Sequence, residues 1–127
     1  MNIPYHIQKA ADLVIESLMT EVKGIKAVVI STEDGFEVAA RTENTAQVSR
    51  LSAMASSLAA LGAIAGEESN LGACDNLCIQ AENGHIVMLQ ARNPAMGLIV
   101  SVITGTDAII GQVLYFSKVA VKQLNAA

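Results

Sequence analysis

The chain has 127 residues, of which 52% are hydrophobic and 3% aromatic, and its formal net charge at pH 7 is −4. This length suits one domain with one core, so we predict a single domain over residues 1–127. The Lys and Arg residues are scattered singly, which argues against nucleic acid as the main ligand because nucleic-acid binders carry a basic patch. A small domain buries a limited share of its surface, so some of this apolar material is expected to meet a partner.

We expect no targeting signal in the N-terminal residues and no membrane span in the longest uncharged run. Residues 1–6 lack a basic region followed by an apolar core, so they do not resemble a signal peptide. The uncharged run over residues 51–66 is shorter than the ~20 apolar residues of a spanning helix and is diluted by Ser and Gly. We therefore expect a cytoplasmic protein with no membrane span.

The first half of the chain predicts a helix, a hairpin and a second helix. Apolar residues at helical spacing predict a helix over residues 5–22, which Gly24 ends. A strand over 25–31, the turn Asp34-Gly35 and a strand over 36–41 form a predicted hairpin. A helix-like run of Ala, Ser, Leu and Gly follows over residues 45–69 and ends near Gly72.

The second half predicts three strands and a last helix. A strand over 73–81 reaches the hairpin signal Asn83-Gly84, and a strand over 85–91 returns. Asn93-Pro94 breaks the chain before a strand over 97–103. Residues 104–107 offer a turn and an N-cap to a helix with one apolar stripe, formed by Ile109, Val113, Phe116, Ala120 and Leu124.

The polarity of the strands predicts their order in the sheet. The strands over 25–31, 85–91 and 97–103 are apolar on both faces, whereas those over 36–41 and 73–81 are half polar. Half-polar strands belong at sheet edges or over a single covered face. With hairpin partners adjacent and the half-polar strands outermost, only the order 2-1-5-4-3 remains, and helices must cover both faces. The predicted fold class is α/β, an α-β-β-α-β-β-β-α sandwich with a mainly antiparallel sheet, of the profilin and longin kind.

The middle helix has two distinct faces. Leu51, Met54, Leu58, Leu61 and Ala65 recur at helical spacing, and we expect this stripe to pack on the sheet. The opposite face is small rather than charged, which lets a second helix approach closely, and an outermost third strand leaves an edge for a symmetry mate. A helix buried within one domain is the alternative. The predicted dimer interface consists of Ser49, Ser52, Ala53, Ser56, Ala60, Ala63, Asn76 and Cys78.

No residue set predicts catalysis or a cofactor. Gly62 and Gly66 are not followed by the Lys of a phosphate-binding loop. His85 follows a hairpin turn, and Asp34 before Gly is ordinary turn chemistry. No Ser-His-Asp or Cys-His set can be assembled, so we expect no catalytic residues and no enzyme.

Cys74 and Cys78 are the only cysteines. On one strand they would stand about 13 Å apart at ~3.3 Å per residue, which is too far for a mutual disulfide. No further ligands lie nearby at metal-binding spacing. We predict two reduced thiols that are buried or half-buried, and no metal site.

Several stretches resemble the roadblock family, which is related to a dynein light chain. In residues 22–39, Gly24-Ile25 enters the first strand and Asp34-Gly35 precedes Phe36, as in the hairpin of that family. The Ala- and Leu-rich middle helix and the segment Ile110-Gly111-Gln112-Val113-Leu114 are also similar, and the order of elements matches over nearly the whole chain. The sequence departs from the family at Glu33, where a basic residue is common, and in its cysteines.

The resemblance implies a homodimer whose sheets join into one surface with the middle helices side by side. Bacterial members of the Mgl type bind small Ras-like GTPases and stimulate hydrolysis by reshaping the GTPase's own site, while eukaryotic relatives are adaptors on dynein or lysosomal scaffolds. No family arginine can be carried onto Arg50 or Arg92. We therefore expect a non-enzymatic homodimeric regulator of a small Ras-like GTPase, similar to a GTPase-activating protein.

Two alternatives stay open. One is a passive dimeric adaptor for a motor, receptor or signalling complex. The other is a small-ligand sensor, which needs a ligand-sized apolar cavity beside the fifth strand. The candidate partner contacts are exposed residues near the middle helix, namely Arg50, Glu67, Glu68 and Asn70.

Overall fold

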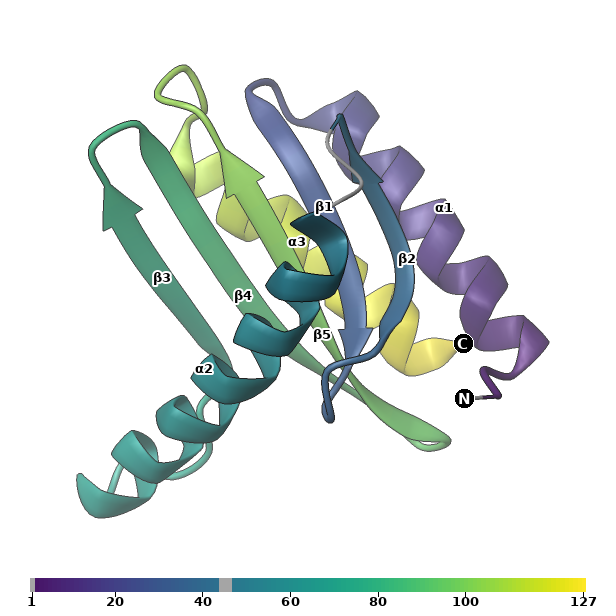
Figure 1. Ribbon diagram of the computed structural model, residues 1–127, viewed down its shortest axis with the longest axis vertical. Helices are drawn as coiled ribbons and strands as arrows, with labels where there is room; N and C mark the ends of the chain where they lie inside the picture. Colours follow the sequence, from purple (N-terminus) through teal and green to yellow (C-terminus); the bar gives the residue numbers. More distant parts are fainter. Residues whose placement is uncertain (1, 44–46) are drawn as a thin grey trace.

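The computed structural model describes residues 2–43 and 47–127 (Figure 1). The predicted order of elements is confirmed, and the predicted start of the middle helix at residue 45 lies outside the described residues. The helices and strands are α1 (Tyr5–Glu21), β1 (Ile25–Thr32), β2 (Glu37–Thr42), α2 (Val48–Glu68), β3 (Asn76–Ala81), β4 (Gly84–Asn93), β5 (Met96–Thr104) and α3 (Ile110–Ala126).

The described strands form one five-stranded sheet in the order β2-β1-β5-β4-β3. Every neighbouring pair is antiparallel, including β1 with β5, which joins the two hairpins. Helices α1 and α3 lie on one face of the sheet and α2 lies on the other (Figure 1). The predicted fold class and strand order are therefore confirmed.

The face under α1 and α3 holds the main hydrophobic core. Helix α1 contributes Ile7, Val14 and Leu18, and α3 contributes Val113 and Leu124, all at most 2% exposed. These side chains pack on alternate residues of the central strands, as expected for strands that are covered on both faces. The residues of this cluster in β1, β4 and β5 are Val28, Ile30, Val87, Leu89, Ala91, Leu98, Val100 and Val102.

The start of α3 differs from the prediction. The helix begins at Ile110, its N-cap position is Ile109 in an extended conformation, and no side chain among the described residues caps it. Residues 104–107 therefore supply a turn but no cap. Because Ile109 lies before the first helical residue, helical periodicity does not place it in the core, and it is 62% exposed.

Helix α2 rests on the sheet through small residues. Its buried residues are Val48, Ser52, Ala55 and Gly62, and Ala55 packs with Met88 of β4 and Ile99 of β5. The C-terminal part of α2 extends past the sheet (Figure 1).

The predicted packing stripe of α2 is wrong for its outer members, since Met54 is 49% exposed, Leu61 is 61% exposed and Ala65 is also exposed. The other two, Leu51 and Leu58, are half-buried. The physical reason is that small residues bring the helix axis close to the strands, so the large side chains project along the side of the helix.

Candidate interaction surface

The side of α2 that faces β4 carries large apolar side chains. We call Leu51, Met54, Leu58 and Leu61 the apolar flank. Leu51, Met54 and Leu58 border an apolar cavity of about 10 Å³ whose other walls include Ile86 and Met88 of β4 and Ser101 and Ile103 of β5. The flank therefore overhangs the half of the sheet that ends in β3.

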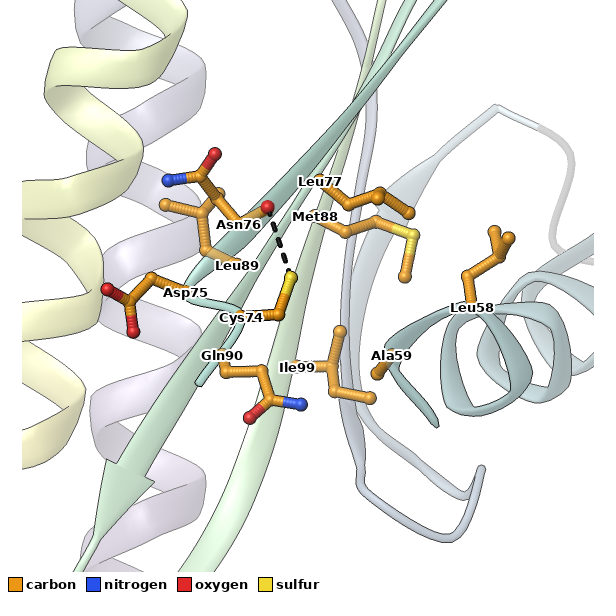
Figure 2. Close-up of a pocket in the computed structure, with 10 residues that line it drawn as sticks. All are labelled: Leu58, Ala59, Cys74, Asp75, Asn76, Leu77, Met88, Leu89, Gln90 and Ile99. Carbon is orange, nitrogen blue, oxygen red and sulfur yellow. Dashed lines mark hydrogen bonds between the residues drawn. The ribbon is translucent and has the colours of Figure 1, made fainter. Parts of the chain in front are cut away.

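In the described part of the chain the sheet continues beyond the apolar flank without a helix over it, because α2 runs over β1, β5 and one end of β4 and leaves much of β3 and β4 open (Figure 1). Leu77 of β3 and Met88 of β4 are register partners, and both side chains point to the α2 side of the sheet (Figure 2). Ile79 and Ile86 form the next pair on this side, and both are half-buried. We call Leu77, Ile79 and Ile86 the apolar floor.

The opposite side of α2 contacts the chain's own β1–β2 turn. The Ser56 hydroxyl donates a hydrogen bond to the Glu33 carbonyl at 2.6 Å. A Cβ on Gly35, whose φ is +96°, would lie 3.5 Å from both Ala53 Cα and Ser56 Cβ. The small side chains therefore make room for the Asp34-Gly35 turn, which ties the first hairpin to α2.

This geometry separates the two parts of the predicted dimer interface. Ser52 is 0% exposed, so its assignment to that interface is wrong: the residue lies between α2 and the sheet. Ser49, Ala53, Ala60 and Ala63 are exposed and Ser56 is half-buried, and their role in a dimer stays a prediction. Ala53 and Ser56 contact the turn between β1 and β2, whereas Asn76 and Cys78 are exposed on β3, at the other edge of the sheet.

The two glycines of α2 receive the chain that follows the helix. A Cβ on Gly62 would lie 3.0 Å from Cys74 Sγ, and one on Gly66 would collide with the Gly72 carbonyl. Arg92 holds the end of this loop by hydrogen bonds to the Asp75 carboxylate at 3.2 Å and the Cys74 carbonyl at 3.4 Å. These glycines therefore serve the α2–β3 connection within one chain.

Asn70 has a structural role at the end of α2. Its φ is +58°, its N–H donates to the Glu67 carbonyl, and the N–H of Leu71 donates to the Gly66 carbonyl. This pair of bonds is the Schellman motif that closes many helices. Leu71 is 82% exposed, because Gly66 offers it no side chain to pack on.

The predicted partner contacts do not form one cluster. Arg50 stands in the first turn of α2 and Glu67 and Glu68 in its last, all exposed. At 1.5 Å rise per residue the two ends are about 25 Å apart. A partner that touches both ends must lie along the whole helix.

A family model for the Roadblock/LC7 domain matches residues 11–101. The chain belongs to the Roadblock/LC7 family. No functionally curated protein matches the sequence. The family resemblance noted in the sequence is thereby confirmed.

Solved structures of Roadblock/LC7 proteins share the fold. The Roadblock/LC7 domain from Streptomyces avermitilis is 20% identical, with a TM-score of 0.82 over 91% of this chain and 94% of that chain. Myxococcus xanthus MglB is 12% identical, with a TM-score of 0.84 over 99% of this chain and 92% of that chain. The gliding protein MglB from Thermus thermophilus is 16% identical, with a TM-score of 0.84 over 98% of this chain and 92% of that chain. At these identities the likeness shows the fold.

Possible metal-binding groups and cavities are the features of this Roadblock/LC7 chain that bear on ligand binding. Within the described residues no group of three or more His, Cys, Asp or Glu side chains is placed to hold a metal ion. Two apolar cavities lie against β5, at Ile99 and at Ser101 with Ile103, and each has a volume of about 10 Å³. Each of these two is room for about one water molecule. An open depression of about 740 Å³ at the end of β5, whose lining includes Ile25, Arg41 and Ile103, is large enough for a small ligand, so the small-ligand sensor stays a prediction.

The two thiols differ in exposure. Cys74 is half-buried, which confirms the prediction for this thiol. Its Sγ donates a weak hydrogen bond to the Asn76 carbonyl at 3.3 Å (Figure 2). Cys78 is exposed, so the prediction of burial is wrong for it. Its side chain stands on the face of β3 away from α2, because the neighbouring Leu77 points to the α2 side (Figure 2).

Helix α2 is long and apolar enough to cross a membrane by length and composition, and little of it is buried inside the domain. The expectation of no membrane span drawn from residues 51–66 is therefore not supported by this measure. The same low burial leaves most of the helix surface available to a protein partner.

Proposed function

We propose that this Roadblock/LC7 chain is a cytoplasmic, non-enzymatic homodimer that binds a small Ras-like GTPase and changes its nucleotide cycle. The observation that carries the proposal is the apolar flank of α2, exposed beside an uncovered apolar floor and an open sheet edge. Large apolar surface of this kind on a small domain marks a protein interface. The family resemblance supports the choice of partners.

The geometry supports a dimer contact different from the one that the sequence indicates. A second copy that places its own α2 against the apolar flank would cover Met54 and Leu61, which are 49% and 61% exposed. The same copy would cover the apolar floor, because flank and floor adjoin at Leu58, Leu77 and Met88. The apolar flank therefore replaces the small-residue side of α2 as the proposed helix contact.

A charge placed on each side of α2 tests this contact. We expect Leu61→Asp to produce a monomer in light scattering, because a carboxylate in a dry helix contact loses its hydration without a partner. Ser49→Asp is the matched control, since Ser49 is exposed on the same helix outside the flank. Dimer loss in the control alone would place the contact on the small-residue side.

Regulation requires the dimer to bind one state of the GTPase better than the other, since a ligand shifts an equilibrium only by its differential affinity. The test adds the dimer to a small Ras-like GTPase captured from the same cell and measures single-turnover GTP hydrolysis. A raised rate supports the regulator. Binding of scaffold or motor proteins without any change in rate would assign the passive adaptor instead.

The acidic end of α2 is the proposed partner contact. Glu67 and Glu68 are exposed at the end that extends past the sheet, so charge reversal there leaves the flank untouched. We expect Glu67→Lys with Glu68→Lys to weaken GTPase binding while light scattering still shows a dimer. Glu37→Lys on β2 is the matched surface control, and an unchanged affinity in the double variant removes both glutamates from the site.

A further inference from the structure

The free edge of β3 has a defined hydrogen-bonding pattern. The Asp75 carbonyl accepts from the Gln90 N–H at 3.1 Å, just before the register pairs Leu77 with Met88 and Ile79 with Ile86. In an antiparallel pair, residues that bond to the neighbour alternate with residues that bond the other way. Residues 77, 79 and 81 therefore bond toward β4. The backbone groups of Asn76, Cys78 and Gln80 point to the open edge.

A two-fold axis restricts how two such edges can meet. In the proposed homodimer both α2 helices lie on the same face of the joined sheet, so the axis is perpendicular to the sheet. Directly opposed residues must then point to the same face, which limits the centre of the register to a single residue. Within β3 the registers of greatest overlap are centred on Cys78 or on Ile79.

The hydrogen-bonding pattern decides between these two registers. With Cys78 at the centre, Asn76 opposes Gln80 of the partner subunit on each side, which gives three hydrogen-bonded pairs. With Ile79 at the centre, only Cys78 and Gln80 find partners within the strand, which gives two pairs. The Cys74 thiol already donates to the Asn76 carbonyl, but that oxygen has a second lone pair. The register centred on Cys78 satisfies every outward-pointing residue of β3.

We propose that two copies of this chain join along β3 with Cys78 at the two-fold axis, which sets the two Cys78 thiols face to face as a redox-sensitive lock. The proposal rests on the proposed homodimer and adds its register and its modification site. Opposed Cα atoms in a hydrogen-bonded antiparallel pair are about 5.5 Å apart, inside the range of about 4.4–6.8 Å for disulfides. Their Cβ atoms, also about 5.5 Å apart, must approach by about 1 Å, so the disulfide is strained and easily reduced. On the α2 side, Leu77 meets Ile79 of the partner subunit and extends the apolar floor across the axis.

The covalent step is a thiol–disulfide exchange with a low-molecular-weight disulfide such as oxidised glutathione. The Cys78 thiolate attacks one sulfur, forms a mixed disulfide and releases one glutathione thiolate. The thiolate of Cys78 of the partner subunit then attacks the protein sulfur and releases the second glutathione. Two protein thiols are oxidised to one disulfide, and one glutathione disulfide is reduced to two thiols.

The first test is crosslinking by oxidised glutathione, followed by non-reducing electrophoresis. In the Cys74→Ser variant, Cys78 is the only cysteine, and we expect a covalent dimer that dithiothreitol reverses. The matched control Cys78→Ser keeps Cys74 and is expected to stay uncrosslinked. The variant Cys74→Ser with Cys78→Ser and Ile79→Cys moves the thiol to the other register centre, and we expect it to crosslink at least about tenfold more slowly.

Each other outcome has a distinct meaning. Faster crosslinking at position 79 overturns the register. No crosslinking at position 78 in a sample that light scattering shows to be dimeric also overturns it, and leaves a dimer held by the apolar flank. A monomer in light scattering refutes the proposed homodimer itself, which separates that failure from the failure of the register.

The second test uses charge and needs no cysteine chemistry. In the Cys78-centred register, residue 76 opposes residue 80 of the partner subunit, whereas within one strand the two are about 13 Å apart. We expect Asn76→Lys with Gln80→Glu to dimerise several-fold to about tenfold more tightly than Asn76→Lys with Gln80→Lys, because opposite charges then face each other twice. Equal dissociation constants by sedimentation contradict the register.

Discussion

The two faces of the sheet are built differently. The face under α1 and α3 gathers nineteen buried hydrophobic residues into one cluster, whereas the described residues of the α2 face gather three, so the first face provides most of the folding energy. Three hydroxyls in the α2 layer, those of Ser31, Ser52 and Ser101, are buried with no hydrogen-bond partner among the described residues. The comparison teaches that one face stabilises the chain and the other offers a surface to a partner.

The largest expected effect is a difference in unfolding free energy between a substitution in the main core and one in the apolar flank. Leu124 is fully buried in the main core, so Leu124→Ala is expected to lower the free energy of unfolding by about 2–5 kcal/mol. Met54 is 49% exposed, and Met54→Ala is expected to change the stability of the monomer by less than about 0.5 kcal/mol. Urea unfolding at a protein concentration low enough to keep both variants monomeric measures the two. Equal losses would mean that the α2 face holds the monomer as firmly as the main core.

The closing turn of α2 gives the next effect. Asn70 has a φ of +58°, a conformation that Asn tolerates and Ala does not, so Asn70→Ala is expected to lower the unfolding free energy by about 1 kcal/mol. Asn70→Gly keeps that conformation accessible and should lie within a few tenths of a kcal/mol of the native chain. If both variants lose GTPase binding while thermal unfolding leaves Asn70→Ala unchanged, Asn70 acts through a partner instead.

The bond that ties the first hairpin to α2 is expected to contribute less. Ser56→Ala removes the hydrogen bond to the Glu33 carbonyl, worth about 0.5–1.5 kcal/mol, against a gain in helix propensity of about 0.5 kcal/mol. The net loss in chemical denaturation should be below about 1 kcal/mol. Ser57→Ala, at the exposed neighbouring position, has the propensity gain alone and serves as the control. A Ser56 variant as stable as this control would mean that the bond contributes nothing.

The smallest expected effect has the opposite sign. Ser52→Ala removes a buried hydroxyl that lacks a partner among the described residues, so we expect a gain of up to about 1 kcal/mol in the free energy of unfolding. Comparison with Ser57→Ala separates the burial effect from helix propensity. A loss of stability would show that the Ser52 hydroxyl is hydrogen-bonded in solution.

The strand order could be derived from the sequence because period-two polarity reports directly which strands are covered on both faces. The turns at Gly24 and Asp34-Gly35 were equally accessible, and the structure gives positive φ angles at Gly24 and Gly35. The face of α2 that packs on the sheet could not be derived from the sequence. A Leu stripe and a small-residue stripe predict opposite packing faces, and the close seat made by Ser52, Ala55 and Gly62 decides between them.

The existence of an interaction surface could therefore be predicted from the sequence, but not all of the residues that form it. The surplus of apolar residues and the edge position of β3 both indicated an interface. Two signals were misread: Ser52 of α2 was assigned to a partner although it is buried between the helix and the sheet, and Leu61 was assigned to the core although it is 61% exposed. Gly62 and Gly66 show the same limit, because only the fold reveals that the returning loop occupies the space they leave.

The C-terminal part of α2 projects past the sheet, so a small change in the angle of the helix displaces its end by a larger distance. The helix packs on the sheet through the buried residues Ser52 and Ala55, and Glu68 lies about 20 Å further along the helix axis at 1.5 Å per residue. A tilt of about 10° at the seat swings that end through about 3 Å, which is the length of a hydrogen bond. The chain that returns to β3 packs on Gly62 and Gly66 in this part of the helix, so that connection helps to set the position of the acidic end.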